Sequence, residues 1–183
     1  TLVGFRHLKV NTRYFEDLIN QIKNKPNNFI EKVSKGKSFW KAINNDNMKF
    51  NAIVGNPPYQ VNDGSGASDD AANPVYQLFT RISIQINPLY FSLIMPSKWM
   101  IGGKVVLKPF RKEMMNDTHI SKLFDMEDSA YCFSGQHIDG GICYFLWDKN
   151  HSGELMYNYR PANSDPFISY RLLNDGISDI IIR

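Results

Sequence analysis

The chain has 183 residues, a formal net charge of +3, and a composition that is 43% hydrophobic and 13% aromatic. This composition excludes an intrinsically disordered chain and suffices for one domain with a sizeable core. The mildly basic charge permits a polyanionic partner without requiring one. No apolar run reaches the ~18 residues of a membrane span and no signal peptide is visible, so we expect no membrane partner.

The two cysteines, Cys132 and Cys143, have neither CxxC spacing nor clustered histidines beside them. We therefore expect no disulfide framework and no metal site, and a reduced, cytoplasmic setting. The sequence starts at Thr1 and not at a methionine, so we expect it to be part of a longer protein.

The first 49 residues are predicted to form a helical N-terminal segment. Residues 12–22 (TRYFEDLINQI) carry apolar residues at helical spacing, with Thr12 as a candidate N-cap. A second helix is predicted to start near Asn28, and residues 39–43 suggest a third, short one.

Strands and helices alternate in the next part of the chain. Residues 50–54 (FNAIV) predict a buried strand, and residues 61–73 (VNDGSGASDDAAN) predict a loop. Residues 73–86 predict a helix in which Asn73 is the N-cap and Pro74 takes the first position. Further strands are predicted at 89–95, 119–126, 140–149 and 154–160, and a further helix at 107–117.

This alternation between residues 50 and 126 predicts a parallel sheet with right-handed crossovers. The strands at 140–149 and 154–160 have no helix between them, so we expect them to pair antiparallel. The expected fold is thus α/β, with a mostly parallel sheet that ends in an antiparallel pair.

The sequence Asn56-Pro57-Pro58-Tyr59 follows the first predicted strand directly. In open parallel sheets, ligands bind beyond the carboxyl ends of the strands. The Asn56 side chain offers a carbonyl acceptor, and Pro58 holds Pro57 extended so that the Pro57 carbonyl has a fixed direction. Tyr59 offers a flat face for stacking. These groups suit a planar ligand that bears an NH2 group.

Two acceptors on one amino group have a chemical consequence. They favour a pyramidal nitrogen with an exposed lone pair, which can attack a methyl sulfonium directly. This is catalysis by position and electrostatics, without a covalent enzyme intermediate.

NPPY resembles the (D/N)PP(Y/F) motif of S-adenosylmethionine-dependent amino-methyltransferases, in the form typical of DNA adenine-N6 enzymes. Residues 50–150 as a whole resemble the methylase part of bifunctional type II restriction–modification enzymes. The blocks that carry this resemblance after NPPY are PVYQLF, LIMPSKWMIGGK and CFSGQHIDGGICYFLWDK. It implies a Rossmann-like class I methyltransferase fold, S-adenosylmethionine as cofactor, and double-stranded DNA as partner.

The resemblance also implies roles for individual residues. Asn56 and Pro57 would bind the amino group of a flipped adenine, and Tyr59 would stack on the base. Pro58 completes the catalytic motif. Phe133 is the candidate for the opposite face of the base, with Tyr131 as the alternative; a core position for Phe133 is equally compatible with the sequence.

The segment PSKWMIGGKVVLKPFRK is predicted to be a basic loop and helix beside this site. Lys98 and Lys104 are candidates for contact with DNA phosphates, against the simpler interpretation of a solvated surface. Trp99 is expected to anchor the loop.

The family's glycine-rich cofactor motif, motif I, is not found in residues 1–49 or downstream of NPPY. We therefore expect residues 50–160 to be the C-terminal, catalytic half of the methyltransferase domain, with cofactor-binding residues unknown and little activity in isolation. Residues 161–183 are expected to begin a target-recognition region or to close the domain. An open edge on the first strand would be covered by the N-terminal helices or would pair with a second copy in a homodimer, and we expect some self-association.

Two alternatives remain open. One is an NPPY methyltransferase that acts on RNA or on a protein glutamine, since the pocket chemistry would be the same. The other is a noncatalytic DNA-binding or assembly module. No nuclease motif is recognised, so we do not expect this segment to cut DNA.

Overall fold

The computed structural model describes residues 15–35, 39, 48–61 and 73–183. The chain divides into two compact units, Thr1–Lys49 and Phe50–Arg183. The described helices of the first unit are α1 (Leu18–Asn24) and α2 (Pro26–Ser34). Both predicted helices therefore exist, with shifted starts. The predicted cap Thr12, residues 40–43 and most of the predicted loop, residues 62–72, lie outside the described residues.

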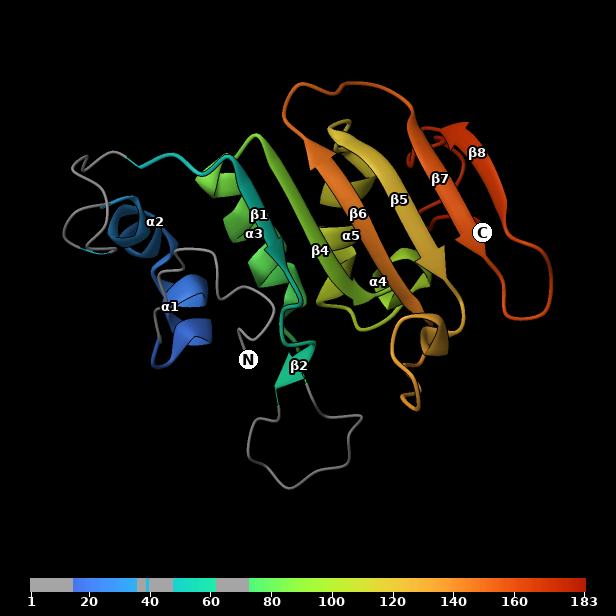
Figure 1. Ribbon diagram of the computed structural model, residues 1–183, viewed down its shortest axis with the longest axis horizontal. Coiled ribbons are helices and arrows are strands. Elements are labelled where there is room, and N and C mark those ends of the chain that lie inside the picture. Colours follow the sequence, from blue (N-terminus) through green and yellow to red (C-terminus); the bar gives the residue numbers. More distant parts are fainter. Residues whose placement is uncertain (1–14, 36–38, 40–47, 62–72) are drawn as a thin grey trace, which may run out of the picture. The chain divides into compact units, whose positions relative to one another are not determined.

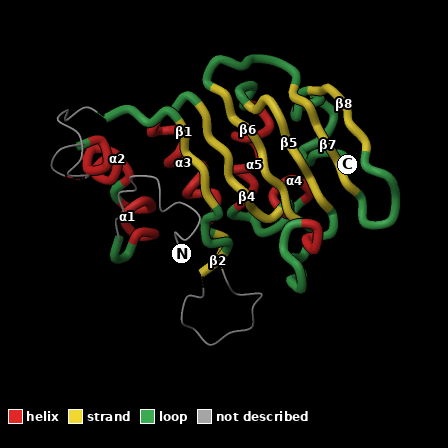
Figure 2. The backbone as a smooth tube through the Cα atoms, viewed as in Figure 1, coloured by secondary structure: helices red, strands yellow, loops and turns green. Residues whose placement is uncertain are grey.

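The Phe50–Arg183 unit contains a six-stranded sheet with the order β1-β4-β6-β5-β7-β8 (Figures 1 and 2). Its strands are β1 (Ala52–Gly55), β4 (Tyr90–Pro96), β5 (Ile120–Met126), β6 (Ile142–Asp148), β7 (Leu155–Arg160) and β8 (Phe167–Arg171). The register places β1, β4, β5 and β7 in one direction and β6 and β8 in the other. The predicted α/β fold with a mostly parallel sheet is confirmed.

The predicted antiparallel pairing of 140–149 with 154–160 is wrong. Strand β6 lies between β4 and β5 and is antiparallel to both, whereas β7 pairs in parallel with β5. In this place both edges of β6 are hydrogen-bonded, and its side chains Cys143 and Phe145 are buried in the core. The chain between β6 and β7 therefore crosses β5, so that β7 pairs with the edge of β5 that faces away from β6.

Three helices cover one face of the sheet (Figure 1). They are α3 (Tyr76–Ile86), α4 (Lys98–Ile101) and α5 (Leu107–Asn116). The helix predicted from residue 73 starts later, because Asn73–Pro74 forms strand β3, which pairs with β2 (Gln60–Val61). The α5 prediction is confirmed, whereas α4 and β8 were not predicted.

Strand β1 is an edge strand and not the buried strand that its apolar sequence predicts. Among the described strands it pairs only with β4. Its Val54 side chain is 81% exposed, whereas Ile53 packs against the core. Within the described residues of the Phe50–Arg183 unit, the expected open edge at this strand is therefore confirmed.

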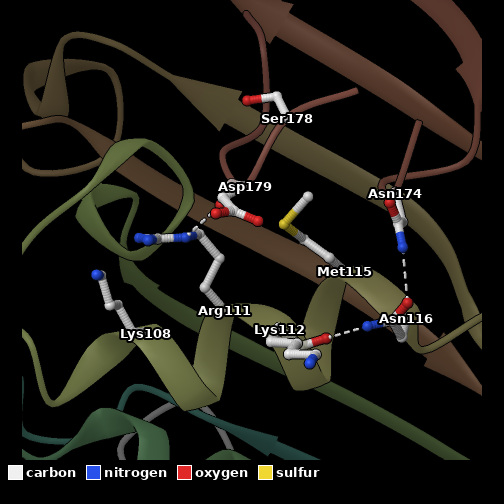
Figure 3. A pocket seen from close by; sticks show the side chains of 8 residues that line it. All are labelled: Lys108, Arg111, Lys112, Met115, Asn116, Asn174, Ser178 and Asp179. Carbon is white, nitrogen blue, oxygen red and sulfur yellow. Dashed lines mark hydrogen bonds between the residues drawn. The ribbon is translucent and has the colours of Figure 1, made fainter. Parts of the chain in front are cut away.

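The residues after β8 pack against α5 (Figure 3). Arg111 Nε donates to the Asp179 carbonyl at 2.7 Å, and the Asn174 amide donates to Asn116 Oδ1 at 2.7 Å. Ile181 is buried in the same core. The C-terminal residues thus belong to the same unit as the sheet. In the described ranges, no helix is long and apolar enough to cross a membrane.

Candidate active site

Asn56 to Tyr59 lie at the carboxyl end of β1. Pro57 is buried, Tyr59 is half-buried against the core, and Asn56 is exposed. The Tyr59 carbonyl accepts from the Val75 amide at 3.0 Å, which ties the motif to the start of α3. The backbone around the motif is therefore anchored at both ends, by β1 and by this bond.

The acceptors that the sequence predicts at this motif have no protein donor in the described structure. Neither the Asn56 side chain nor the Pro57 carbonyl bonds to another described residue. Both carbonyl oxygens are hydrogen-bond acceptors, so they are available to a ligand that carries N–H groups.

Phe133 is carried by the loop that follows a short 3-10 helix at Ser129–Tyr131. The buried Ser129 hydroxyl donates to the Gln136 carbonyl at 2.7 Å and accepts from the Ile138 amide at 2.9 Å. The Phe133 amide donates to the Ser129 carbonyl at 2.9 Å. One buried serine thus fixes the loop on both sides of Phe133.

The structure brings this loop and NPPY together around one pocket of about 450 Å³, which we call the base pocket after the flipped base that the sequence predicts there. Such a volume is within the usual range for small-ligand sites. Its lining residues are Asn56, Tyr59, Cys132, Phe133, Ser134, Gln136 and Ile138.

Phe133 is half-buried and is not part of the core cluster, so a core position does not explain it. The alternative candidate, Tyr131, does not line the base pocket. The Arg160 guanidinium lies 3.7 Å from the centre of its ring. Geometry therefore favours Phe133 as the second aromatic wall.

Lys98 and Lys104 line a second pocket of about 550 Å³, and Tyr59 belongs to the walls of both pockets. Lys98 forms an ion pair with Asp139 on the surface. The two predicted DNA-contacting lysines thus lie together, next to the motif.

The remaining residues of the basic segment are mainly structural. Trp99 is completely buried, which confirms its predicted anchoring role. Arg111 is buried and donates to the carbonyls of Trp99 and Gly102 at 3.2 and 2.8 Å. The predicted loop therefore contains a short helix, α4, and these contacts hold the turn at Gly102 and Gly103 between α4 and α5.

Sequence reasoning missed a buried polar network below the site. Asp125, at the end of β5, accepts from the Ser97 hydroxyl at 2.7 Å and from the Tyr157 hydroxyl at 2.9 Å. Arg183 completes the network through both carboxylate oxygens. The signal was a charged residue inside the apolar segment LFDM at the end of this strand.

Burial has a clear effect on the ionisable groups next to the base pocket. It raises the pKa of the Tyr59 hydroxyl to about 12, with a smaller contribution from the nearby Cys143. Burial likewise raises the pKa of the Cys143 thiol to about 12. Both groups are therefore neutral near pH 7, and neither is an anionic nucleophile at that pH.

The family model of the Eco57I restriction-modification methylase matches residues 1–133, more than half of the chain. The chain belongs to the Eco57I restriction-modification methylase family. The predicted resemblance to adenine methylases of restriction–modification systems is thereby confirmed.

A relative supports the same conclusion. An uncharacterized adenine-specific methylase from Mycoplasma pneumoniae is 38% identical over 111 residues, which cover 61% of this chain and 26% of that protein. The chain thus spans about a quarter of the length of this relative.

Solved structures show a weaker likeness. The methyltransferase subunit of a type I restriction-modification system from Streptococcus thermophilus has a TM-score of 0.44 and 14% identity, over 64% of this chain and 28% of that one. The type IIG restriction endonuclease BpuSI has a TM-score of 0.43 and 18% identity, over 60% of this chain and 15% of that one. Similarity at this level establishes no shared function.

Proposed function

We propose that this chain supplies the target-base pocket of an enzyme that methylates the N6 amino group of adenine in DNA, within a restriction–modification system. The observation that carries the proposal is the base pocket, which Asn56 and Tyr59 share with Phe133 from a distant part of the chain. The adenine-specific methylase that is 38% identical to this chain supports adenine as the target.

The proposed roles follow from the chemistry of each group. The Asn56 side-chain carbonyl and the Pro57 carbonyl accept the two N–H bonds of the amino group and hold the nitrogen in place. Pro58 keeps the Pro57 carbonyl in a fixed direction. Tyr59 and Phe133 stack on the two faces of the base, which compensates for the stacking lost when the base leaves the duplex.

We propose S-adenosylmethionine as the methyl donor. When bound, it would supply an electrophilic methyl group to the amino nitrogen held by Asn56. The described residues do not form its cradle, because within residues 48–61 and 73–183 no glycine-rich turn leads from a strand into a helix at the edge where Asn56 lies.

The proposal that the cofactor site is incomplete in this chain has a direct test. Calorimetric titration of S-adenosylmethionine into the purified chain should show no micromolar binding and little methyl transfer to DNA. Clear micromolar binding, or efficient methylation by the chain alone, would contradict the proposal that the cofactor site is incomplete here.

We propose double-stranded DNA as the partner. We propose the bacterial cytoplasm as the place where the protein binds it. Lys98 and Lys104 lie beside the base pocket, where positive charge would contact the phosphates that flank an extruded base. The open edge of β1 offers a site for a homodimer, since an unpaired strand can pair with a second copy.

Recognition of the amino group is tested by two labelled duplexes that differ in a single group. One carries a mismatched adenine and the other carries purine, which lacks the amino group, at the same position. A mismatch lowers the cost of extrusion. Fluorescence anisotropy should show about two- to tenfold tighter binding of the adenine duplex, because purine leaves both acceptors unpaired.

Two controls complete this test. The Asn56→Ala variant should lose most of the preference for adenine, whereas Tyr170→Ala, at an exposed aromatic residue of β8, should keep it. Equal binding of the two duplexes by the unmodified chain would contradict the proposal. Preference for an adenine-containing RNA or a glutamine peptide would instead support an NPPY methyltransferase with another substrate.

A further inference from the structure

We propose that Arg183 is a positioning residue of the base pocket, because it holds one wall of the pocket in the conformation that receives the target base. This wall consists of residues 136–141, called the wall segment below, of which Gln136 and Ile138 line the pocket. The inference deepens the proposed function and rests on it for the identity of the base.

The wall segment is held at its start by Ser129. The buried Ser129 hydroxyl donates to the Gln136 carbonyl at 2.7 Å and accepts from the Ile138 amide at 2.9 Å. The Gly141 amide then donates to the Ile138 carbonyl at 3.0 Å, which closes a turn. The position of the far end of the segment depends on what binds the carbonyls of Gly140 and Gly141.

Both of these carbonyls are bound by residues that the Asp125 carboxylate orients. Arg183 Nη2 donates to the Gly140 carbonyl at 2.8 Å and to Asp125 Oδ1 at 3.0 Å. The Ser97 amide donates to the Gly141 carbonyl at 3.0 Å, and the Ser97 hydroxyl donates to Asp125 Oδ1 at 2.7 Å. One buried carboxylate therefore fixes both contacts at the end of the wall segment.

The place of Arg183 is itself fixed by its neighbours in the chain. Ile181 is 1% exposed, and its amide donates to the Met100 carbonyl at 2.9 Å. The Ile182 carbonyl accepts from Arg171 at 3.0 Å. A planar guanidinium that is bound to a carboxylate through two nitrogens has a defined orientation. Its remaining donor is therefore directed at the Gly140 carbonyl.

Two observations favour a positioning role over a contribution to stability alone. A buried ion pair is often no more stabilising than apolar side chains of similar volume, because desolvation offsets the attraction. Gly140 and Gly141 have φ values of +83° and +84°, and glycine has a wide choice of backbone conformations. Contacts from outside the wall segment have to select one of these conformations, and Arg183 supplies such a contact.

Movement of the wall segment would change the shape of the base pocket beside its aromatic wall. Ile138 and Phe133 line the same pocket, and both are bonded to Ser129 through their amides. A displaced wall would therefore weaken binding of a base without the loss of any group that contacts it.

Thiol labelling of the complete chain tests the positioning role without DNA. Cys132 lines the base pocket, whereas Cys143 is completely buried in the core. Arg183→Lys keeps a positive charge beside Asp125 but loses the planar fork that also holds Gly140. At pH 8 this variant should label about two- to tenfold faster at Cys132, since the wall segment loses a hydrogen bond. Mass spectrometry should show Cys143 still unlabelled.

Tyr157→Phe is the matched control. The Tyr157 hydroxyl donates to the same Asp125 carboxylate at 2.9 Å, so its loss weakens the network without releasing Gly140. This variant should label Cys132 at the rate of the unmodified chain. An unchanged rate in Arg183→Lys would overturn the inference. Labelling of Cys143 in step with Cys132 would also overturn it, because the variant would then act through overall stability.

A second measurement connects the wall segment to the base. In anisotropy, Arg183→Lys should bind the mismatched adenine duplex about two- to tenfold more weakly and a fully paired duplex equally well. Faster labelling of Cys132 with unchanged affinity for the adenine duplex would contradict a role in base binding. Failure of the proposed function has a different sign: the unmodified chain would bind adenine and purine duplexes equally, whatever the labelling rates.

Discussion

Asp125 and Arg183, 58 residues apart, form a two-pronged ion pair inside the Phe50–Arg183 unit. Arg183 Nε donates to one carboxylate oxygen at 2.8 Å, and a terminal guanidinium nitrogen donates to the other at 3.0 Å. The same nitrogen donates to the Gly140 carbonyl at 2.8 Å. Because Asp125 also accepts from Ser97, this pair links the turns that carry Lys98 and the Phe133 loop.

The buried pair should be important for stability. Arg183→Gln leaves the completely buried Asp125 carboxylate without its cation and should lower the free energy of unfolding by about 3 kcal/mol. Urea denaturation measures this loss. Arg81→Gln is the matched control, because Arg81 bonds to Glu113 in the same two-pronged way on the surface, at 2.7 and 3.0 Å. It should cost less than about 1 kcal/mol, and equal losses would contradict the assigned role.

Gly141 should tolerate no side chain. Its φ is +84°, and an added Cβ would lie 2.2 Å from the Met126 carbonyl oxygen. Gly141→Ala should therefore destabilise the chain by more than about 2 kcal/mol in urea denaturation. Gly135 has a similar φ of +75° but open space around it, so Gly135→Ala should cost only about 1 kcal/mol. A Gly141→Ala variant as stable as Gly135→Ala would show that the backbone there is free to move.

The two cysteines should differ in reactivity toward a thiol reagent. Burial raises the pKa of Cys143 to about 12, so at pH 8 only a very small fraction is thiolate. Cys132 is half-buried, and its pKa is raised less strongly by the same cause. The native chain should react at one thiol, slowly at pH 8 and faster at pH 9, and at two thiols in guanidinium. Cys132→Ser should abolish the native reaction, and fast labelling of that variant would contradict the burial of Cys143.

The open edge of β1 should govern self-association. Val54 is 81% exposed on this edge, and Val54→Lys should shift the chain toward monomer in light scattering, since charge blocks edge pairing. Val105→Lys is the control, because Val105 is 80% exposed and lies between α4 and α5, outside the described strands. If the unmodified chain is already monomeric at high concentration, the proposed dimer is wrong.

Local features of the sequence predicted most strands and the position of NPPY, because strand composition and proline signals act over a few residues. The order of the strands was not predictable in the same way. The sequence of residues 140–160 does not predict that β6 pairs with β4 and β5, because strand order depends on contacts between segments that are distant in the chain.

The buried face of α3 illustrates a second limit. Its apolar residues Leu78 and Phe79 are only half-buried, whereas the polar residues Thr80 and Ser83 are buried. Both hydroxyls bond to carbonyls of their own helix, Ser83 to Phe79 at 2.8 Å. Satisfied small polar residues let the helix pack closely, and hydrophobicity alone does not reveal this.

The candidate site was predictable where one motif carries the chemistry. Asn56 and Tyr59 could be named from NPPY, and the structure places Phe133 in the same pocket. The catalytic and base-binding roles of these residues stay predictions. The partners in the Asp125 network could not be foreseen, because burial and hydrogen-bond partners are properties of the folded chain.

The measurement that tests the central claim most directly is the fluorescence of 2-aminopurine placed at a mismatch in a duplex. Addition of the chain should raise the fluorescence as the base leaves the stack, with partial quenching by Tyr59 and Phe133. Phe133→Ala should weaken binding by about 1–3 kcal/mol and relieve part of the quenching, whereas Tyr170→Ala should change neither. Saturated binding of the duplex with no change in 2-aminopurine fluorescence would contradict the claim that the base pocket receives an extruded base.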